Sequence, residues 1–266
     1  MRREPNLKIQ RALGEHLMKG FTGRVVLVTG AASGIGRATV QALAAAGGTV
    51  VATDLCPAEM IELPSGDHLA LSLDVTDESA VERAIERTIG RYGRLDGVVA
   101  CAGIVCNGPA HRVDRAAWER GIAVHLSGAF LTCKYALTPM MAARTGAIVL
   151  VSSIYGMTGC AGNTPYNVAK GGVLQLMRSL AADYASYGIR VNAVSPGYIE
   201  TPMTASLTGE TRDAFIRMHL LGRPGTHGEV ASAIVFLLSD AASFITGVNL
   251  PVDGGFSAAK SIDWAR

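Results

Sequence analysis

Charge is sparse in this chain of 266 residues. Only 17% of the residues are charged, and the formal net charge is +2. No block or stripe of Lys and Arg stands out, so the sequence lacks the electrostatic footprint of a nucleic-acid or anionic-membrane binder. No apolar run reaches the roughly 20 residues that a membrane-spanning helix needs. We therefore expect neither nucleic acid nor a membrane as a partner.

Cysteine is also scarce, and its five positions follow no pattern: Cys56, Cys101, Cys106, Cys133 and Cys160. Their number is odd, and their spacing matches neither a disulfide framework nor a metal site. The six histidines are dispersed as well. Reduced thiols in a cytoplasmic protein that binds no metal are the simplest account of these positions.

The first 20 residues lack an apolar core and carry charges of both signs, so they do not resemble a secretory signal. Ile9, Ala12, Leu13 and Leu17 fall at helical spacing. This spacing predicts a short amphipathic helix, with a disordered extension as the alternative. Residues 21–266 are long enough for one domain with a large core.

Apolar residues are abundant, at 49%, and so is glycine, at 31 residues. Short β-branched runs alternate with segments of helical periodicity, and no linker or repeat interrupts them. This pattern predicts an α/β fold with a single doubly wound parallel sheet and helices on both faces. The expected strands are residues 24–29, 49–53, 68–72, 96–100, 147–151, 190–194 and 248–252. The expected helices are residues 35–46, 78–90, 118–141, 165–187 and 230–238.

The first strand leads directly into a glycine-rich turn, Gly30–Gly36, which opens a helix. A turn of this kind forms a phosphate cradle, because glycines let the backbone approach and the helix N–H groups face the anion. Asp54 ends the second strand, 18 residues after Gly36. This spacing is close to that of a carboxylate that binds the ribose hydroxyls of a dinucleotide. The first part of the chain therefore predicts nucleotide binding.

Glycines and polar residues also follow the other strands. In doubly wound sheets, ligands bind in the crevice outside the carboxyl ends of the strands. We therefore expect these strand-end segments to converge on one cleft: Gly30–Gly36, Asp54, Asp74, Ala102-Gly103, Ser153 and Pro196-Gly197.

Tyr166 and Lys170 lie four residues apart, which places them on one face of the predicted helix. Thr164 is the expected N-cap and Pro165 the first helical residue, so Tyr166 falls in the first turn. A helix N-terminus and a nearby ammonium both lower the pKa of a phenol from its ordinary value of about 10. Such a phenol can move a proton on or off an alcohol oxygen. Taken alone, the pair fits an ordinary surface pair equally well.

Together these motifs resemble the short-chain dehydrogenase/reductase family, in its single-domain branch, over about residues 21–257. Thr29 and the glycine turn match the cofactor turn of that family. Ala102-Gly103 matches the end of its Asn-Asn-Ala-Gly segment, although Ala100-Cys101 replace the two asparagines.

The catalytic motif of the family has its match in the second half of the chain. Ser153 stands thirteen residues before Tyr166 and matches the catalytic serine, while Tyr166 and Lys170 match the catalytic pair. Pro196-Gly197 with Thr201 matches the segment beside the nicotinamide. The resemblance implies a Rossmann fold that transfers a hydride between a nicotinamide cofactor and a secondary alcohol or ketone.

The resemblance also implies a role for each matched residue. Tyr166 exchanges the proton with the substrate oxygen, Ser153 holds that oxygen, and Lys170 lowers the pKa of Tyr166 and binds the nicotinamide ribose. The expected substrate contacts are Ser153, Tyr155, Cys160 and Tyr166. The expected cofactor contacts, besides Tyr166 and Lys170, are Gly30, Ser33, Gly34, Ile35, Gly36, Asp54, Asp74, Val75, Ala102, Gly103, Pro196, Gly197, Ile199 and Thr201.

His125 departs from the family pattern, because an asparagine usually stands at this position and helps to hold a water that links the lysine to solvent. An imidazole can donate and accept hydrogen bonds, so His125 is a candidate to keep this catalytic relay. It also titrates near neutrality, which would add a pH dependence. The alternative is a tolerated substitution in a satisfied core position.

Asp54 favours NAD over NADP as the cofactor. A carboxylate about 4 Å from the 2′-phosphate of NADP costs on the order of 4 kcal/mol per charge pair at an effective dielectric near 20. Ser33 and Leu55, positions where NADP-using relatives often carry Arg or Lys, hold no compensating base. Arg37 is close but lies inside the predicted helix.

Residues 198–228 form a long, mixed segment after the sixth strand, and segments of this length are often lids. No cluster of Arg or Lys marks a phosphate or carboxylate site, so we expect a neutral or mildly polar alcohol or ketone. 3-Oxoacyl thioesters, cyclic alcohols, sugars and polyols all stay open. The helix after Tyr166 is apolar around much of its circumference, which indicates burial on more than one side. Resembling proteins form tetramers through this helix, so we expect a homotetramer.

Two other functions stay open. One is a nucleotide-binding sensor or scaffold that has lost catalysis, which the intact Ser153, Tyr166 and Lys170 disfavour. The other is an epimerase or dehydratase of the longer branch of the family, which also uses a Tyr-Lys pair. The glycine spacing and the lack of a C-terminal substrate domain disfavour this second alternative.

Overall fold

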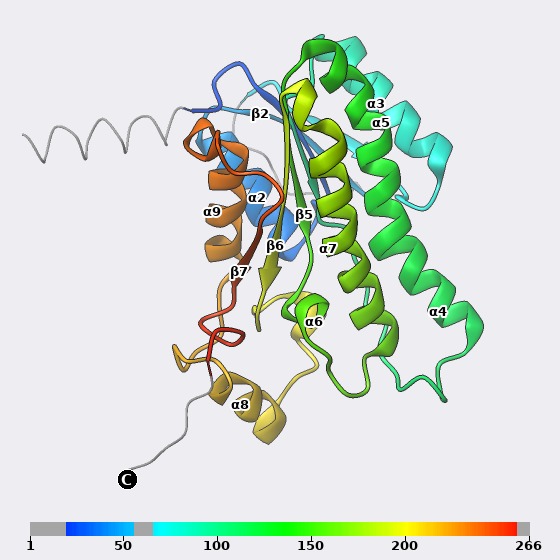
Figure 1. Cartoon of the computed structure of the whole chain (residues 1–266), viewed down its shortest axis with the longest axis vertical. Helices are drawn as coiled ribbons and strands as arrows, with labels where there is room; N and C mark the ends of the chain where they lie inside the picture. Colours follow the sequence, from blue (N-terminus) through cyan, green and yellow to red (C-terminus); the bar gives the residue numbers. More distant parts are fainter. Residues whose placement is uncertain (1–19, 56–65, 260–266) are drawn as a thin grey trace, which may run out of the picture.

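A single parallel sheet forms the centre of the computed structural model, which describes residues 20–55 and 66–259 (Figure 1). The predicted N-terminal helix and Cys56 lie outside the described residues. The sheet has seven strands in the order β3-β2-β1-β4-β5-β6-β7, and all six pairings are parallel. The strands are β1 Val25–Thr29, β2 Thr49–Asp54, β3 Leu69–Ser72, β4 Gly97–Ala100, β5 Gly146–Val151, β6 Ile189–Pro196 and β7 Asn249–Val252. The strand order reverses direction between β1 and β4, which defines a doubly wound fold.

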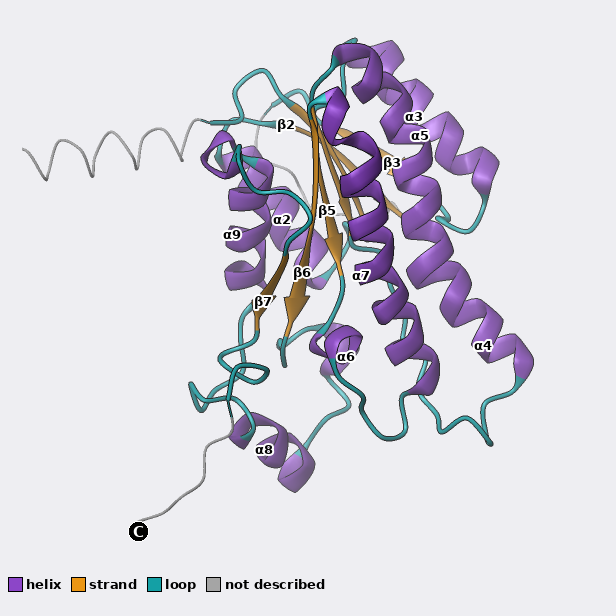
Figure 2. Ribbon diagram, in the orientation of Figure 1, coloured by secondary structure: helices purple, strands orange, loops and turns teal. Residues whose placement is uncertain are grey.

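Helices cover both faces of the sheet (Figures 1 and 2). Helices α2 (Gly34–Ala45) and α9 (His227–Leu238) lie together on one face. Helices α3 (Glu78–Tyr92), α5 (Gly128–Ala143) and α7 (Thr164–Tyr184) lie on the other. The predicted fold class is therefore confirmed. None of the helices in the described part of the chain is long and apolar enough to cross a bilayer.

Two hydrophobic cores, one on each face, follow from the alternation of side chains along β1. Val25 and Leu27 belong to the core beneath α3, α5 and α7, whereas Val26 and Val28 belong to the core beneath α2 and α9. Because successive side chains on a strand point to opposite faces, a strand covered on both sides must be apolar throughout. This explains why the sequence shows continuous apolar runs rather than alternating ones.

The long helix predicted over residues 118–141 is interrupted. The structure has α4 (Arg115–Ile122), a π-helical turn (Ala123–Ser127) and then α5. His125 lies in the π-helical turn. Apolar spacing alone does not distinguish such a turn from a continuous helix, which is why the prediction was wrong here. Turns of this kind are frequent at functional sites.

Two short helices lie beyond the carboxyl ends of the strands (Figure 1). Helix α6 (Ile154–Met157) follows β5 directly, and α8 (Gly209–Arg217) belongs to residues 198–228. A 3₁₀ turn, Pro202–Thr204, lies in the same segment. The sequence indicated the length of this segment but not its helices, because α8 has polar residues around most of its surface and none of its residues is fully buried.

Candidate active site

A cavity of about 380 Å³ opens at the carboxyl ends of the strands. It brings together segments that follow β1, β2, β3, β4, β5 and β6, as the sequence predicted for one cleft. All the expected cofactor positions line it: Gly30, Ser33, Gly34, Ile35, Gly36, Asp54, Asp74, Val75, Ala102, Gly103, Tyr166, Lys170, Pro196, Gly197, Ile199 and Thr201. Ser153 and His125 line the same cavity.

The glycine turn packs too tightly for side chains at two of its positions. A Cβ at Gly30 would lie 2.9 Å from the Ala102 Cα, and Gly30 also has a φ of +67°. A Cβ at Gly36 would lie 2.0 Å from the Gly30 carbonyl oxygen. The Thr29 hydroxyl accepts hydrogen bonds from the N–H groups of Cys101 and Ala102, at 3.1 and 3.2 Å. The ends of β1 and β4 are thus held together beside the N-terminus of α2.

The Asp54 carboxylate is fixed at the end of β2. One oxygen accepts a hydrogen bond from the Ala32 N–H at 2.9 Å, and the other accepts one from the Leu55 N–H at 2.7 Å. Among the described residues that line the cavity, Lys170 is the one Lys or Arg side chain. A bare glycine turn at a helix N-terminus, with a carboxylate at the next strand end, fits the pyrophosphate and the ribose of a dinucleotide.

Ser153 and Tyr166 meet at the opposite end of the cavity. Ser153 is the N-cap of α6, and its hydroxyl accepts a hydrogen bond from the Tyr155 N–H at 3.1 Å. The same hydroxyl lies close enough to the Tyr166 phenol to lower the pKa of that phenol. Helix α7 begins at Thr164 with Asn163 as its N-cap, so the predicted N-cap was wrong by one residue. Pro165 still lies in the first turn, and it places Tyr166 there.

Burial raises the pKa of Tyr166 to about 12, and the Ser153 hydroxyl opposes this rise. The expectation of a lowered pKa was therefore wrong for the chain by itself. The sequence shows a helix N-terminus and a nearby lysine, but not the loss of water around the phenol. Removing water destabilises the phenolate more than the Ser153 hydroxyl stabilises it.

The Lys170 ammonium is buried behind Tyr166. Its side chain is 5% exposed, and Nζ donates a hydrogen bond to the Val151 carbonyl oxygen at 2.8 Å. Nζ lies 5.8 Å from the centre of the Tyr166 ring. Burial lowers the pKa of Lys170 to about 8. The lysine is thus mainly protonated at neutral pH, beside the phenol.

His125 packs edge-on against Tyr166, with the ring centres 5.2 Å apart. Its Nε2 faces both backbone groups of Ile104, the carbonyl oxygen at 2.8 Å and the N–H at 3.3 Å. The carbonyl contact is the shorter one and its oxygen can only accept, which favours a proton on Nε2. Nδ1 is then an acceptor, and it has no hydrogen-bond partner among the described residues. Burial and the charge of Lys170 lower the pKa of His125 to about 3. The expectation that His125 titrates near neutrality was therefore wrong.

The two remaining substrate candidates, Tyr155 and Cys160, do not line the cavity. Burial and the neighbouring Cys160 thiol raise the pKa of the Tyr155 hydroxyl. The Tyr155 ring stacks on Phe215 of α8, with ring centres 6.0 Å apart and an interplanar angle of 28°. These residues therefore connect the Ser153 side of the site to α8 rather than face the cavity directly.

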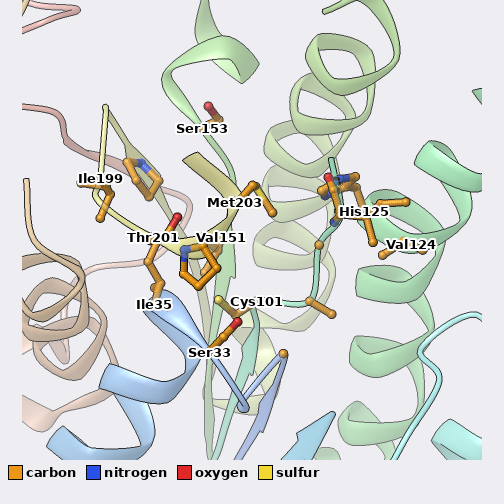
Figure 3. A pocket seen from close by; sticks show the side chains of 18 of the residues that line it. Ser33, Ile35, Cys101, Val124, His125, Val151, Ser153, Ile199, Thr201 and Met203 are labelled. Carbon is orange, nitrogen blue, oxygen red and sulfur yellow. Dashed lines mark hydrogen bonds between the residues drawn. The ribbon is translucent and has the colours of Figure 1, made fainter. Parts of the chain in front are cut away.

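Ten further lining residues are not among the expected cofactor, substrate or catalytic contacts: Leu55, Leu73, Cys101, Ile104, Val124, Val151, Ser152, Pro202, Met203 and Thr204. Most of them are direct neighbours of predicted positions. Met203 is different, because it reaches across the cavity from the segment after β6 (Figure 3). Its Cε lies 3.6 Å from the position of a Cβ at Gly103, and the Thr201 methyl lies 3.3 Å from a Cβ at Gly34. The segment after β6 thus covers the glycine turn and the end of β4.

Fold and site together define a class of protein: a doubly wound domain whose glycine turn and strand-end carboxylate fit a dinucleotide, with a buried tyrosine in the same cavity. A family model described as enoyl-(acyl carrier protein) reductase matches residues 30–257. The cis-4-hydroxycyclohexanecarboxylate dehydrogenase of Sinomonas cyclohexanicum is 47% identical over 246 residues, which cover 90% of this chain and 99% of that protein. A 3-oxoacyl-(acyl-carrier-protein) reductase of Thermotoga maritima is 39% identical over 239 residues, which cover 88% of this chain and 97% of that protein.

A solved structure, that of levodione reductase, superimposes with a TM-score of 0.86 at 36% identity. The match covers 90% of this chain and 99% of that chain. The chain belongs to the short-chain dehydrogenase/reductase family. It is an oxidoreductase of the class that uses a nicotinamide cofactor.

The low pKa of His125 predicts that the substitution His125→Asn will flatten the acid dependence of stability. Between pH 6.5 and about 3, the unfolded chain protonates this imidazole and the folded chain does not, so stability falls as the pH falls. At pH 5 the wild type should have lost about 2 kcal/mol that the variant keeps. Urea unfolding at pH 7.5 and pH 5 measures this difference. Equal losses in both proteins would contradict it.

Proposed function

We propose that this protein is an NAD-dependent secondary-alcohol dehydrogenase or ketone reductase. The observation that carries the proposal is the arrangement of Ser153, Tyr166 and Lys170 at one end of a cavity whose other end is formed by the glycine turn and Asp54. A carbonyl placed against Ser153 would lie between the proton donor and the cofactor site.

Each side chain then has one task. The bound nicotinamide supplies or accepts the hydride. Tyr166 gives its proton to the substrate oxygen in reduction and takes it back in oxidation. Ser153 donates a hydrogen bond to the same oxygen and fixes its position. Lys170 stabilises the phenolate that forms, because its charge is buried close to the ring. The protonated phenol of the free chain is already in the form that carbonyl reduction needs.

His125 is proposed as a neutral hydrogen-bond acceptor behind this group. Its buried Nδ1 can accept a hydrogen bond from a donor such as a water molecule. The hydrogen bond of Nε2–H to Ile104 keeps the ring in the tautomer that leaves Nδ1 unprotonated. The residue would then support the proton path without changing its own charge.

The substrate is proposed to be a small secondary alcohol or ketone on a largely apolar skeleton. Lys170 is the one cation that lines the cavity in the described part of the chain, and it is engaged with Val151. Among the described residues, no second cation is therefore available in the cavity to bind a phosphate group of the substrate. The relatives named for a hydroxycyclohexane carboxylate and for levodione support a carbon skeleton of modest size.

NAD is the proposed cofactor, because the fixed Asp54 carboxylate can accept hydrogen bonds from a ribose diol and would repel a 2′-phosphate. Arg37, the nearest base in the sequence, does not line the cavity.

We predict that Asp54→Ala will narrow the preference for NAD over NADP. The lost repulsion is on the order of 4 kcal/mol for one charge pair at about 4 Å, so the ratio of kcat/KM for the two cofactors should fall at least about tenfold. Initial rates with both cofactors measure the ratio. If the wild type already turns over NADP as well as NAD, the charge argument fails.

The decisive experiment compares Tyr166→Phe with His125→Asn. The phenylalanine keeps the ring and removes the proton donor, so turnover should fall by about 10²-fold or more. The asparagine keeps a hydrogen-bonding group, so turnover should change by about tenfold at most. Absorbance of reduced nicotinamide, followed with a panel of cyclic and linear ketones and alcohols, measures both. A Tyr166→Phe protein that retains most of its activity would overturn the catalytic assignment.

A cytoplasmic homotetramer is the proposed assembly. Phe130 on α5 and Val168 on α7 are each more than 40% exposed, although large apolar side chains are usually covered. They lie on helices whose other faces pack on the sheet, so a second copy is the proposed cover. We predict the mass of four chains by light scattering, and a monomer would refute this assembly.

A further inference from the structure

His219 occupies a position that the mechanism above does not use. Its side chain is 3% exposed, and it lies at the meeting point of three segments beyond the carboxyl ends of the strands. One is the turn after β6, the second is the C-terminal end of α8, and the third is the turn after β7. We propose that His219 is a positioning residue that holds α8 in place against the wall of the active site and thereby sets the affinity for the organic substrate.

The hydrogen bonds of the imidazole connect two of these segments. The Tyr198 N–H donates to Nε2 at 2.9 Å. Nδ1 lies 2.9 Å from the Phe215 carbonyl oxygen, which can only accept, so Nδ1 carries the proton. The neutral ring thus accepts a hydrogen bond from the turn after β6 and donates one to α8. Neither bond can be made by an apolar side chain of the same size.

Close packing fixes the ring at the same point. A Cβ at Gly197 would lie 2.6 Å from the His219 Nε2 and 2.9 Å from the Asp253 Cα. The imidazole therefore lies directly on the backbone of Gly197, which lines the cavity. On its other side the ring packs against Phe256, with ring centres 5.2 Å apart.

Phe215 connects His219 to the end of the site where the substrate is expected. Its ring stacks on Tyr155, two residues after Ser153, and packs against His219 with ring centres 5.5 Å apart. Holding the Phe215 carbonyl therefore also holds the ring that covers the Tyr155 side of the site. Because this proposal concerns substrate affinity, it rests on the dehydrogenase function proposed above.

Residues 198–200, on the cofactor side of the segment after β6, are held by backbone hydrogen bonds that do not involve His219. The Gly225 N–H donates to the Tyr198 carbonyl at 2.8 Å, and the Glu200 N–H donates to the Gly225 carbonyl at 3.2 Å. Residues 198–200 thus stay paired with Gly225 when His219 is lost. Within the described residues, α8 forms no such backbone pairing with another element, and beyond the aromatic contacts of Phe215 it is held by an ion pair between Arg212 and Glu200 at 2.6 Å. Just after α8, the Leu221 N–H donates a hydrogen bond to the Gly254 carbonyl oxygen at 3.1 Å. Replacing His219 should therefore weaken the attachment of α8 more than that of residues 198–200, which lie on the cofactor side of the cavity.

The test compares His219→Leu with His219→Gln and with His68→Leu. The leucine removes both hydrogen bonds, whereas the glutamine amide can both donate and accept. His68 is a matched control, because its Nδ1 also accepts a backbone hydrogen bond, from the Val50 N–H at 3.1 Å, at the opposite end of the sheet. We expect His219→Leu to raise KM for the alcohol or ketone about tenfold, the size typical of a lost buried hydrogen bond. kcat and the KM for the cofactor should change less than about threefold, and His219→Gln should recover most of the loss.

Trypsin cleavage after Arg217 gives a second measurement that needs no substrate. If His219 holds α8, cleavage at this position should be about tenfold faster in His219→Leu than in the wild type or in His68→Leu, because the open form is more populated. Equal cleavage rates, or a KM that rises equally in His68→Leu, would overturn the proposal. If no alcohol or ketone is turned over by the wild type, the dehydrogenase function fails, and the cleavage rates still decide the role of His219.

Discussion

The candidate active site is built around one buried positive charge. Lys170 is enclosed between β5 and α7, and burial shifts its pKa from 10.5 to about 8. Keeping it protonated at neutral pH costs the folded chain about 3 kcal/mol. Two hydrogen bonds link Lys170 to the end of β5. The side-chain Nζ donates one to the Val151 carbonyl oxygen, and the backbone carbonyl of Lys170 accepts one from the Ser152 hydroxyl. They fix the first turns of α7 against the end of β5, and so place Tyr166 beside Ser153.

The surroundings leave little freedom for this arrangement to shift. A Cβ at Gly156 would lie 2.5 Å from the Ser152 hydroxyl oxygen and 2.7 Å from the Lys170 carbonyl oxygen. A Cβ at Gly172 would lie 2.7 Å from the side chain of Leu126. Glycine at these two positions lets α6 and the π-helical turn approach α7 closely. The close approach excludes water, and this exclusion raises the pKa of Tyr166 as well as lowering that of Lys170.

Most of the fold and most positions of the candidate site could be predicted from the sequence, whereas two pKa values and two local elements could not. The sheet followed from apolar periodicity, and the positions of Gly30–Gly36, Asp54 and Tyr166 followed from spacing along the chain. The pKa values of Tyr166 and His125 did not follow, because they depend on water removed by residues distant in sequence. The π-helical turn and α8 were missed since neither changes the spacing of apolar residues in a distinctive way. Periodicity and motifs therefore locate the groups, while burial decides their protonation.

Two buried imidazoles each pack on a glycine that lines the cavity and belongs to a cofactor motif. A Cβ at Gly103 would lie 2.8 Å from the His125 Cε1, as a Cβ at Gly197 would lie 2.6 Å from the His219 Nε2. The two glycines are thus required by the neighbouring rings, and not only by the approach of a ligand. The rings differ in what they leave unsatisfied. Both nitrogens of His219 are bonded within the chain, whereas Nδ1 of His125 has no partner among the described residues. His219 is therefore suited to hold a segment in place, and His125 to receive a hydrogen bond from a group that enters the site.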